Sequence, residues 1–186
     1  GLYAQYSSGK LFDGRFSTTI GVRYDKQNSD FTGIDTPGRP METLSFSRVS
    51  PRLAFIYHGS DAFSLKLLAG QAFRTPAPTE TFGANTFSLA SNIRGLKPEI
   101  IDTVELASDW TINRNLSWKV NVFHTKFKNQ IGYSPTNYNL STNLYTLTTQ
   151  GLETEFQFGV GALHGFFNGS YAKRVDEESQ DPKITH

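Results

Sequence analysis

Apolar and polar residues alternate along most of this chain. In the segment QGLETEFQFG, residues 150–159, apolar side chains stand at every second position and are separated by Glu153, Glu155 and Gln157. A period of two predicts an extended strand with one apolar face and one polar face. The same alternation recurs in further segments, at residues 15–25, 63–74 and 103–112. The pattern therefore predicts an all-β chain.

Turn signals differ in length at the two ends of the predicted strands. Short clusters of turn residues occur at 7–14, 58–62, 112–115 and 159–162, and longer polar stretches at 26–45, 76–98, 134–143 and from 176 onward. The chain is thus predicted to alternate between short turns at one end of the strands and long loops at the other end. Several alternating segments run for about 10 or 11 residues, which is the length needed to cross a bilayer at a tilt. Strands of soluble sheets more often stop near five or six residues.

One predicted strand carries a shift in its apolar row. In residues 116–131 the row moves from Trp118, Val120 and Val122 to Phe123 and Phe127. One extra residue in the strand produces such a shift, so we expect a β-bulge near Val122.

Helix signals are confined to one short segment. In TPAPTETF, residues 75–82, Thr79 is a candidate cap, and Pro78 stiffens the entry of a helical turn. No longer segment is amphipathic at the helical period of 3.6 residues, so we expect no other helix.

Aromatic residues gather near both ends of the predicted strands. Those flanking the short turns are Tyr6, Phe16, Tyr57, Phe63, Trp110, Trp118, Phe158, Phe166 and Phe167, and those near the opposite ends are Tyr24, Phe73, Tyr133, Tyr145 and Tyr171. Two aromatic girdles with unequal loops are typical of outer-membrane barrels, whose apolar row faces lipid. The alternative is that aromatic residues are simply common in strands. Strand length, loop asymmetry and the girdles together favour the barrel.

Composition narrows the classes of function. The 186 residues include 18 Lys and Arg against 17 Asp and Glu, a formal net charge of +1, which gives no basis for a nucleic-acid partner. Cysteine is absent, which excludes disulfide frameworks, thiolate zinc sites and cysteine nucleophiles. The mean hydropathy is −0.40. No apolar run approaches the ~18 residues of a spanning helix, which excludes a helical membrane protein but not a barrel.

Charged residues on the polar faces are candidates for the interior wall of such a barrel. For any single one of them, solvation of a polar interior is favoured over a specific role. The candidates are Arg23, Arg52, Arg74, Glu105, Glu153 and Glu155.

The long loops carry the candidates for ligand binding, because binding groups concentrate on loops held by a rigid scaffold. Aromatic rings and an arginine suit an anionic or catecholate-like iron chelate through stacking and charge. Packing of these rings in the outer girdle, or of loop against loop, is an equal alternative. The candidates are Phe82, Phe87 and Arg94 in the loop of residues 76–98, and Tyr133, Tyr138 and Tyr145 in residues 133–145.

Signs of catalysis are lacking in the sequence. The four histidines, at positions 58, 124, 164 and 186, fall in separate segments without an accompanying cluster of Asp and Glu. We therefore expect no metal site, and no cofactor. No G-x-S-x-G motif occurs, and SGKL lacks the Ser or Thr that follows lysine in a P-loop. The sequence predicts a protein that is not an enzyme.

Several motifs in order along the chain resemble one family, the TonB-dependent outer-membrane receptors. The segment FSLKLLAGQAFRTPAPTETF resembles a strand ending in an FRAPS–E-like motif, through Phe73, Arg74, Pro76 and Glu80. LKPEIIDTVELASDW, residues 96–110, resembles the family segment that follows, with Ala107 where glycine is usual. TTQGLETEF matches a later strand through Gly151 and Glu153, and STTIGVRYD fits an upstream one.

The resemblance implies a fold and a function. The family has a plugged barrel of the 22-stranded kind. Residues 1–186 would supply about eight antiparallel strands from its later part, a partial barrel domain without the plug. The implied function is uptake of a scarce ligand, most often a ferric siderophore, across the bacterial outer membrane, with energy delivered by TonB through the plug. In the family, interior wall residues meet the plug or line the ligand path, and the outer face contacts lipid.

Two other classes remain open from the sequence. One is a self-contained eight-stranded outer-membrane barrel acting as an adhesin or structural protein. Side chains fill the interior of so small a barrel, whereas the polar rows here include Gly21, Gly70, Ala107 and Gly151, which are too small to fill it. The other is a soluble all-β binding module, which would bury the girdle residues.

Overall fold

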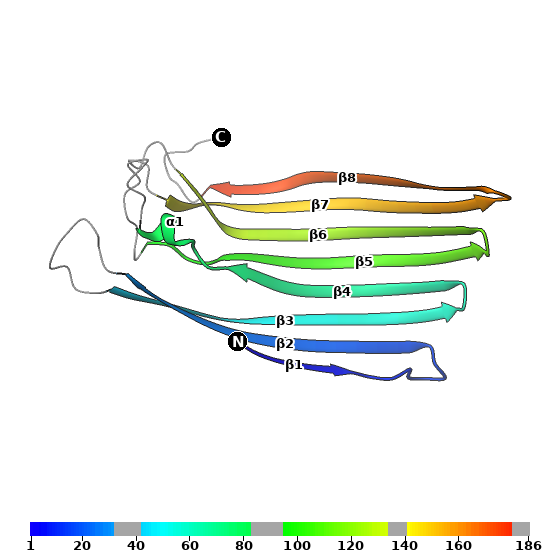
Figure 1. Ribbon diagram of the computed structural model, residues 1–186, viewed down its shortest axis with the longest axis horizontal. Helices are drawn as coiled ribbons and strands as arrows, with labels where there is room; N and C mark the ends of the chain where they lie inside the picture. The colour runs from blue at the N-terminus through cyan, green and yellow to red at the C-terminus, as the bar shows by residue number, and fades with distance from the viewer. Residues whose placement is uncertain (32–41, 83–94, 134–140, 180–186) are drawn as a thin grey trace.

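The computed structural model describes residues 1–31, 42–82, 95–133 and 141–179 (Figure 1). Phe87, Arg94, Tyr138 and His186 lie outside the described residues. Within the described residues, no helix has the length and hydropathy needed to cross a membrane.

Eight strands form one antiparallel sheet, in which each strand pairs with its neighbours in sequence (Figure 1). The all-β prediction and the count of about eight strands are therefore confirmed. A short helix, α1 (Pro78–Phe82), lies at the end of the sheet away from the short turns. The strands are β1 (Leu2–Ser7), β2 (Phe16–Phe31), β3 (Glu42–Ser60), β4 (Phe63–Arg74), β5 (Glu99–Asn113), β6 (Leu116–Tyr133), β7 (Ser141–Val160) and β8 (Leu163–Ser179).

Most strands are longer than the alternation predicted. β3 has 19 residues and β7 has 20. Much of the polar stretch 26–45 that was predicted as loop belongs to β2 and β3, which pair as far as Phe31 and Glu42. Polar side chains hold this extension together, since Ser45 Oγ donates to Asn28 Oδ1 at 2.9 Å. Such polar pairs end the apolar row of their face, so sequence reasoning missed the extension.

One continuous apolar row crosses the sheet. The register aligns Phe55, Leu67, Leu106, Val122, Leu152 and Tyr171 on β3 to β8. All six are exposed, and the buried hydrophobic residues in the described part are Leu96 and Leu144. A soluble sandwich would bury such a row beneath a second sheet. The described residues form a single layer whose apolar face is uncovered.

Aromatic rings line the short-turn end of the same face. The register aligns Phe63, Trp110, Trp118, Phe156 and Phe167 across five strands. The ring centroids of Phe63 and Trp110 are 4.2 Å apart, and Trp118 Nε1 donates to Thr154 Oγ1 at 2.8 Å. The indole N–H is thus satisfied within the sheet while its ring remains partly exposed.

The predicted bulge near Val122 is wrong. The pairing of β6 with β5 and β7 is continuous through this residue, and the irregularities with β7 lie between Phe127 and Ile131. Phe123 belongs to the polar face, where its ring covers Gly151 on β7: a Cβ added at Gly151 would lie 2.3 Å from the ring. The aromatic side chain thus fills the gap that a cross-strand glycine leaves.

The helical turn is present, but its cap was assigned to the wrong residue. Pro78 is the first residue of α1, so Ala77 precedes it and takes the cap position. Glu80 Oε2 accepts the Ala77 N–H at 2.6 Å, and Thr81 Oγ1 donates to Ala77 O at 3.1 Å. A glutamate at the third helical position is the residue that reaches back to the cap N–H, whereas Thr79 is already inside the turn.

Candidate functional site on the polar face

The predicted glutamates of the polar face lie on β5 and β7, on either side of β6. Asn121 on β6 donates through Nδ2 to Glu105 Oε2 on β5 at 3.0 Å and to Glu153 Oε2 on β7 at 3.4 Å. Glu155 pairs with Lys119 at 3.0 Å. One amide thus bridges two carboxylates, and a lysine pairs with the third, so each of the three glutamates has a partner on the polar face.

The three predicted arginines line one hollow on the sheet, formed by β1 to β4. Arg23, Arg52 and Arg74 come from successive strands, and the hollow has a volume of about 810 Å³. Asp25 is the carboxylate that lines it, and it pairs with Arg23, whose Nε lies 2.6 Å from Asp25 Oδ2. The structure therefore brings together cationic residues that the sequence shows only as separate positions on strands.

Arg74 stands at the end of β4, where it joins four elements. Its Nε donates to Glu99 Oε2 on β5 at 2.5 Å, and Nη1 and Nη2 donate to the two oxygens of Glu80 on α1 at 3.0 Å each. Glu99 Oε1 accepts the N–H of Ile131 on β6 at 2.8 Å. The bidentate geometry fixes α1 against the strand ends.

Burial and hydrogen bonding shift the pKa of Glu99 in opposite directions. Burial alone raises the pKa of this carboxyl, but the hydrogen bonds from Arg74 and from the Ile131 N–H outweigh burial and hold the pKa below its usual range. Hydrogen bonding to Glu99 and Glu80 raises the pKa of Arg74. Both groups are therefore ionised at neutral pH and form a charged anchor.

A buried asparagine holds the segment that precedes β5, close to the Arg74–Glu99 contact. Asn143 on β7 is 8% exposed. Its Oδ1 accepts the Lys97 N–H at 2.8 Å, and its Nδ2 donates to Lys97 O at 3.0 Å and to Asn129 O at 2.7 Å. Sequence reasoning missed this residue because Asn143 lies at the edge of a polar stretch, where asparagine is common.

The structure changes the location of the predicted loop aromatics. Tyr133 is the last residue of β6, and Tyr145 lies within β7, so both are strand residues rather than loop residues. Both strands extend further than their alternation indicated. Phe82 ends α1. A role of these residues in ligand binding stays a prediction.

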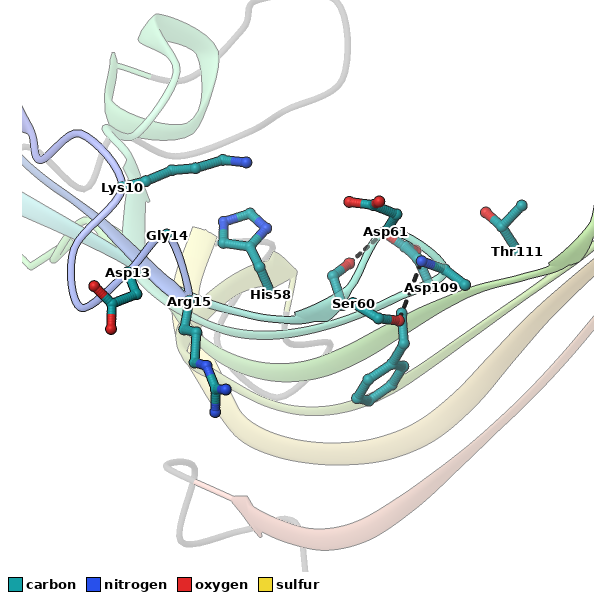
Figure 2. A pocket seen from close by; sticks show the side chains of 12 residues that line it. Lys10, Asp13, Gly14, Arg15, His58, Ser60, Asp61, Asp109 and Thr111 are labelled. Atoms are coloured by element: carbon teal, nitrogen blue, oxygen red, sulfur yellow. Dashed lines mark hydrogen bonds between the residues drawn. The ribbon is translucent and has the colours of Figure 1, made fainter.

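A second hollow lies on the polar face near the short turns (Figure 2). His58 and Asp61 point into it, whereas Arg15 points away. His58 Nε2 is 3.0 Å from Ser17 Oγ, and Ser64 Oγ donates to Asp109 Oδ2 at 3.4 Å. Among the residues with described positions, no three His, Asp, Glu or Cys side chains are placed to hold a metal. This second hollow can therefore offer hydrogen-bonding and charged side chains to a bound molecule.

Arg74→Met should lower the free energy of unfolding by about 2 kcal/mol at pH 7, because Glu99, 7% exposed, loses its charged donor. The pKa of Glu99 is lowered in the fold, so its stabilisation is present above the unfolded value of 4.5 and is lost as pH falls through the folded pKa. The difference between variant and parent should therefore shrink below pH 4.5, as measured by denaturant unfolding in lipid vesicles.

The matched control is Lys119→Met, which removes a cation from an ion pair with an exposed partner. Glu155 keeps 36% of its side-chain surface exposed. We expect a loss clearly smaller than that of Arg74→Met, because exposed ion pairs contribute little to stability. A loss at Arg74 that is equally small, or that stays constant from pH 7 to pH 3, contradicts the charged anchor.

Comparison with known proteins identifies a family for this arrangement. A model of the TonB dependent receptor-like β-barrel matches residues 1–185. None of the curated proteins is similar to this chain in sequence.

Solved structures share the fold over most of this chain. The FrpB iron transporter of Neisseria meningitidis (F5-1 variant) gives a TM-score of 0.67 at 20% identity, over 90% of this chain and 25% of that chain. Copper transporter OprC gives 0.69 at 14% identity, over 93% and 28%. The siderophore receptor PirA of Pseudomonas aeruginosa gives 0.65 at 18% identity, over 92% and 39%. This chain therefore spans well under half of the length of each of these proteins.

Proposed function

Because the chain belongs to the family of TonB-dependent receptor β-barrels of the Gram-negative outer membrane, we propose that it forms part of the wall of a receptor that imports a ferric siderophore. Residues 1–186 would be a partial barrel domain, and the plug would lie elsewhere in the receptor. TonB would supply energy through that plug. The receptor would bind and move its ligand without covalent chemistry.

Two faces of opposite character support a place in a barrel wall. The apolar row from Phe55 to Tyr171 would face lipid, and the glutamates and arginines of the opposite face would line the interior. In a barrel wall, outward apolar residues alternate with inward polar residues along each strand. The uncovered apolar face of this single sheet fits that environment.

The hollow lined by Arg23, Arg52 and Arg74 is the observation that carries the choice of ligand. The solved relatives include transporters named for iron, for copper and for siderophores. A concentration of guanidinium groups attracts an anionic chelate and repels a bare metal cation. The charge therefore favours a ferric siderophore over free copper.

Aromatic residues beyond the polar hollow would make the first contacts with the chelate. Rings and guanidinium groups stack on flat aromatic ligands. The proposed contacts are Phe82, Phe87, Arg94, Tyr133, Tyr138 and Tyr145. Of these, Tyr133 is 51% exposed at the end of β6, so its ring is available to a ligand approaching the strand ends.

Replacing residues 83–94 of the complete receptor with a short Gly-Ser linker should reduce siderophore uptake at least about tenfold, because the segment holds Phe87 and Arg94. The substitution keeps α1 and the Arg74–Glu80–Glu99 contacts, so insertion into the membrane should be unchanged. Uptake is measured with radioactive ferric catecholate and insertion by resistance to surface proteolysis. Unchanged uptake with normal insertion contradicts the role of this segment.

A further inference from the structure

The arginine hollow has an excess of cations over carboxylates. Its lining includes Arg23, Arg52 and Arg74, and Asp25 is the carboxylate among the lining residues. Arg23 is satisfied by Asp25, and Arg74 is satisfied by Glu80 and Glu99. Arg52 differs from both, because it makes neither an ion pair nor a hydrogen bond with any residue in the described part of the chain.

The cross-strand neighbours of Arg52 are two glycines. In the register, Arg52 on β3 stands between Gly21 on β2 and Gly70 on β4. A Cβ added at Gly70 would lie 3.7 Å from Arg52 Cγ, so the arginine stem passes over the bare backbone of Gly70. The ring of Tyr3 covers Gly21 on the other side, with its hydroxyl 3.2 Å from the position of an added Cβ. The stem of Arg52 therefore lies over one glycine, and the ring of Tyr3 lies over the other.

A second unsatisfied group lines the same hollow. Ser50 stands two residues before Arg52, so both side chains project from the same face of β3. It is 7% exposed, and its Oγ has no hydrogen-bond partner among the described residues. A buried hydroxyl without a partner costs free energy, which a bound acceptor would recover.

We propose that Arg52 and Ser50 form an anion subsite that binds a charged oxygen of the imported chelate. The Arg52 guanidinium and the Ser50 hydroxyl would both donate to that oxygen, and the hollow that both residues line would hold it. The subsite rests on the proposed function, because its occupant is the ligand being transported. Its chemistry selects chelates whose donor oxygens carry net negative charge, such as ferric catecholates, over uncharged chelates.

The first experiment compares two ferric chelates that differ in charge. In the complete receptor, Arg52→Gln should weaken binding of the trianionic ferric tris-catecholate about tenfold, because charge-assisted hydrogen bonds are lost. Binding of an uncharged ferric tris-hydroxamate should change less than twofold. Ser50→Ala should act in the same direction with a smaller effect. Affinities are measured by quenching of intrinsic fluorescence in detergent.

Arg114→Gln is the matched control, since Arg114 is an exposed arginine in the turn between β5 and β6. It makes the same change in net charge and should leave both affinities unaltered. Equal losses for the two chelates at Arg52, or no loss for the catecholate, overturn the subsite. If the unaltered receptor binds neither chelate, the proposed siderophore function fails, and a second readout then decides the subsite.

That readout is the labelling of Arg52 by phenylglyoxal, followed by mass spectrometry. Inorganic phosphate, a small anion whose oxygens carry charge at neutral pH, should protect Arg52 in the complete receptor and leave Arg114 labelled. Absence of protection overturns the subsite whatever the receptor transports. Protection without uptake keeps the subsite and rejects only the transport of siderophores. If Arg52 is protected without ligand and becomes labelled once the plug is removed, a segment of the receptor itself occupies the subsite, and the proposal is wrong.

Discussion

Leu152→Arg should lower the free energy of unfolding of the complete receptor in lipid vesicles by about 2–4 kcal/mol, the cost of a cation on the lipid face near mid-membrane. Leu152 stands between Val122 and Tyr171 in the apolar row. Glu153→Arg changes the adjacent residue, which lies near Asn121 on the polar face, and should cost less than about 1 kcal/mol. The measurement is reversible denaturant unfolding of both variants.

The loss of stability alone does not show whether Leu152 faces lipid or a protein core, because arginine would destabilise the protein in either environment. A spin label at position 152 should be relaxed by oxygen dissolved in the bilayer and shielded from a water-soluble nickel complex. The label at position 153 should show the reverse preference. If both positions respond to the nickel complex, or if position 152 is shielded from both reagents, the apolar row does not face lipid.

Gly151→Ala should destabilise the same receptor by about 3 kcal/mol, because the site has no room for a methyl group. The added Cβ would lie 2.3 Å from Phe123 Cζ and 2.6 Å from the backbone oxygen of Tyr171. The ring of Phe123 can rotate, but the backbone oxygen moves only if β8 shifts against β7. The expected result is therefore a loss that Phe123→Ala does not rescue.

Gly169→Ala supplies the matched comparison on β8. A Cβ added there meets Thr154 Cγ2 at 3.4 Å, which is ordinary contact. We expect a change within about 1 kcal/mol, and a small gain is consistent with the reduced freedom of the unfolded chain. Equal effects at the two glycines would show that loss of glycine itself, rather than the contact with Tyr171, determines the cost.

The sequence predicted the centre of the sheet better than its ends. Alternation located the strands around Leu67, Leu106 and Leu152 because one face of each is apolar. The parts of β2 and β3 farthest from the short turns are held by pairs such as Asn28 with Ser45, which make polar the face that is apolar nearer the turns. The length of a strand depends on its partner, and a single sequence does not show which strand that is.

The candidate site could be predicted only as separate residues. Arg74, Glu80 and Glu99 all lie in motifs that the sequence displays, but their contact depends on the register that sets Arg74 opposite Glu99. Alternation alone makes Phe123 a sign of a bulge, because the glycine that it covers lies on the next strand. Ser50 carried no signal at all, since its importance comes from burial without a partner. Their roles in ligand binding stay predictions.

The strict neighbour-to-neighbour order of the sheet bears on how the wall is assembled. Every pairing joins strands that are adjacent in the chain, and β3 reaches β4 through residues 61 and 62. Closing so small a loop costs little entropy, and each completed hairpin presents an open edge on which the next strand can form. The sheet can therefore grow by successive zippering of hairpins, with no early contact between distant parts of the chain. Within the described part, β1 and β8 each keep one unpaired edge, and in the proposed receptor these are the edges with which further strands would pair.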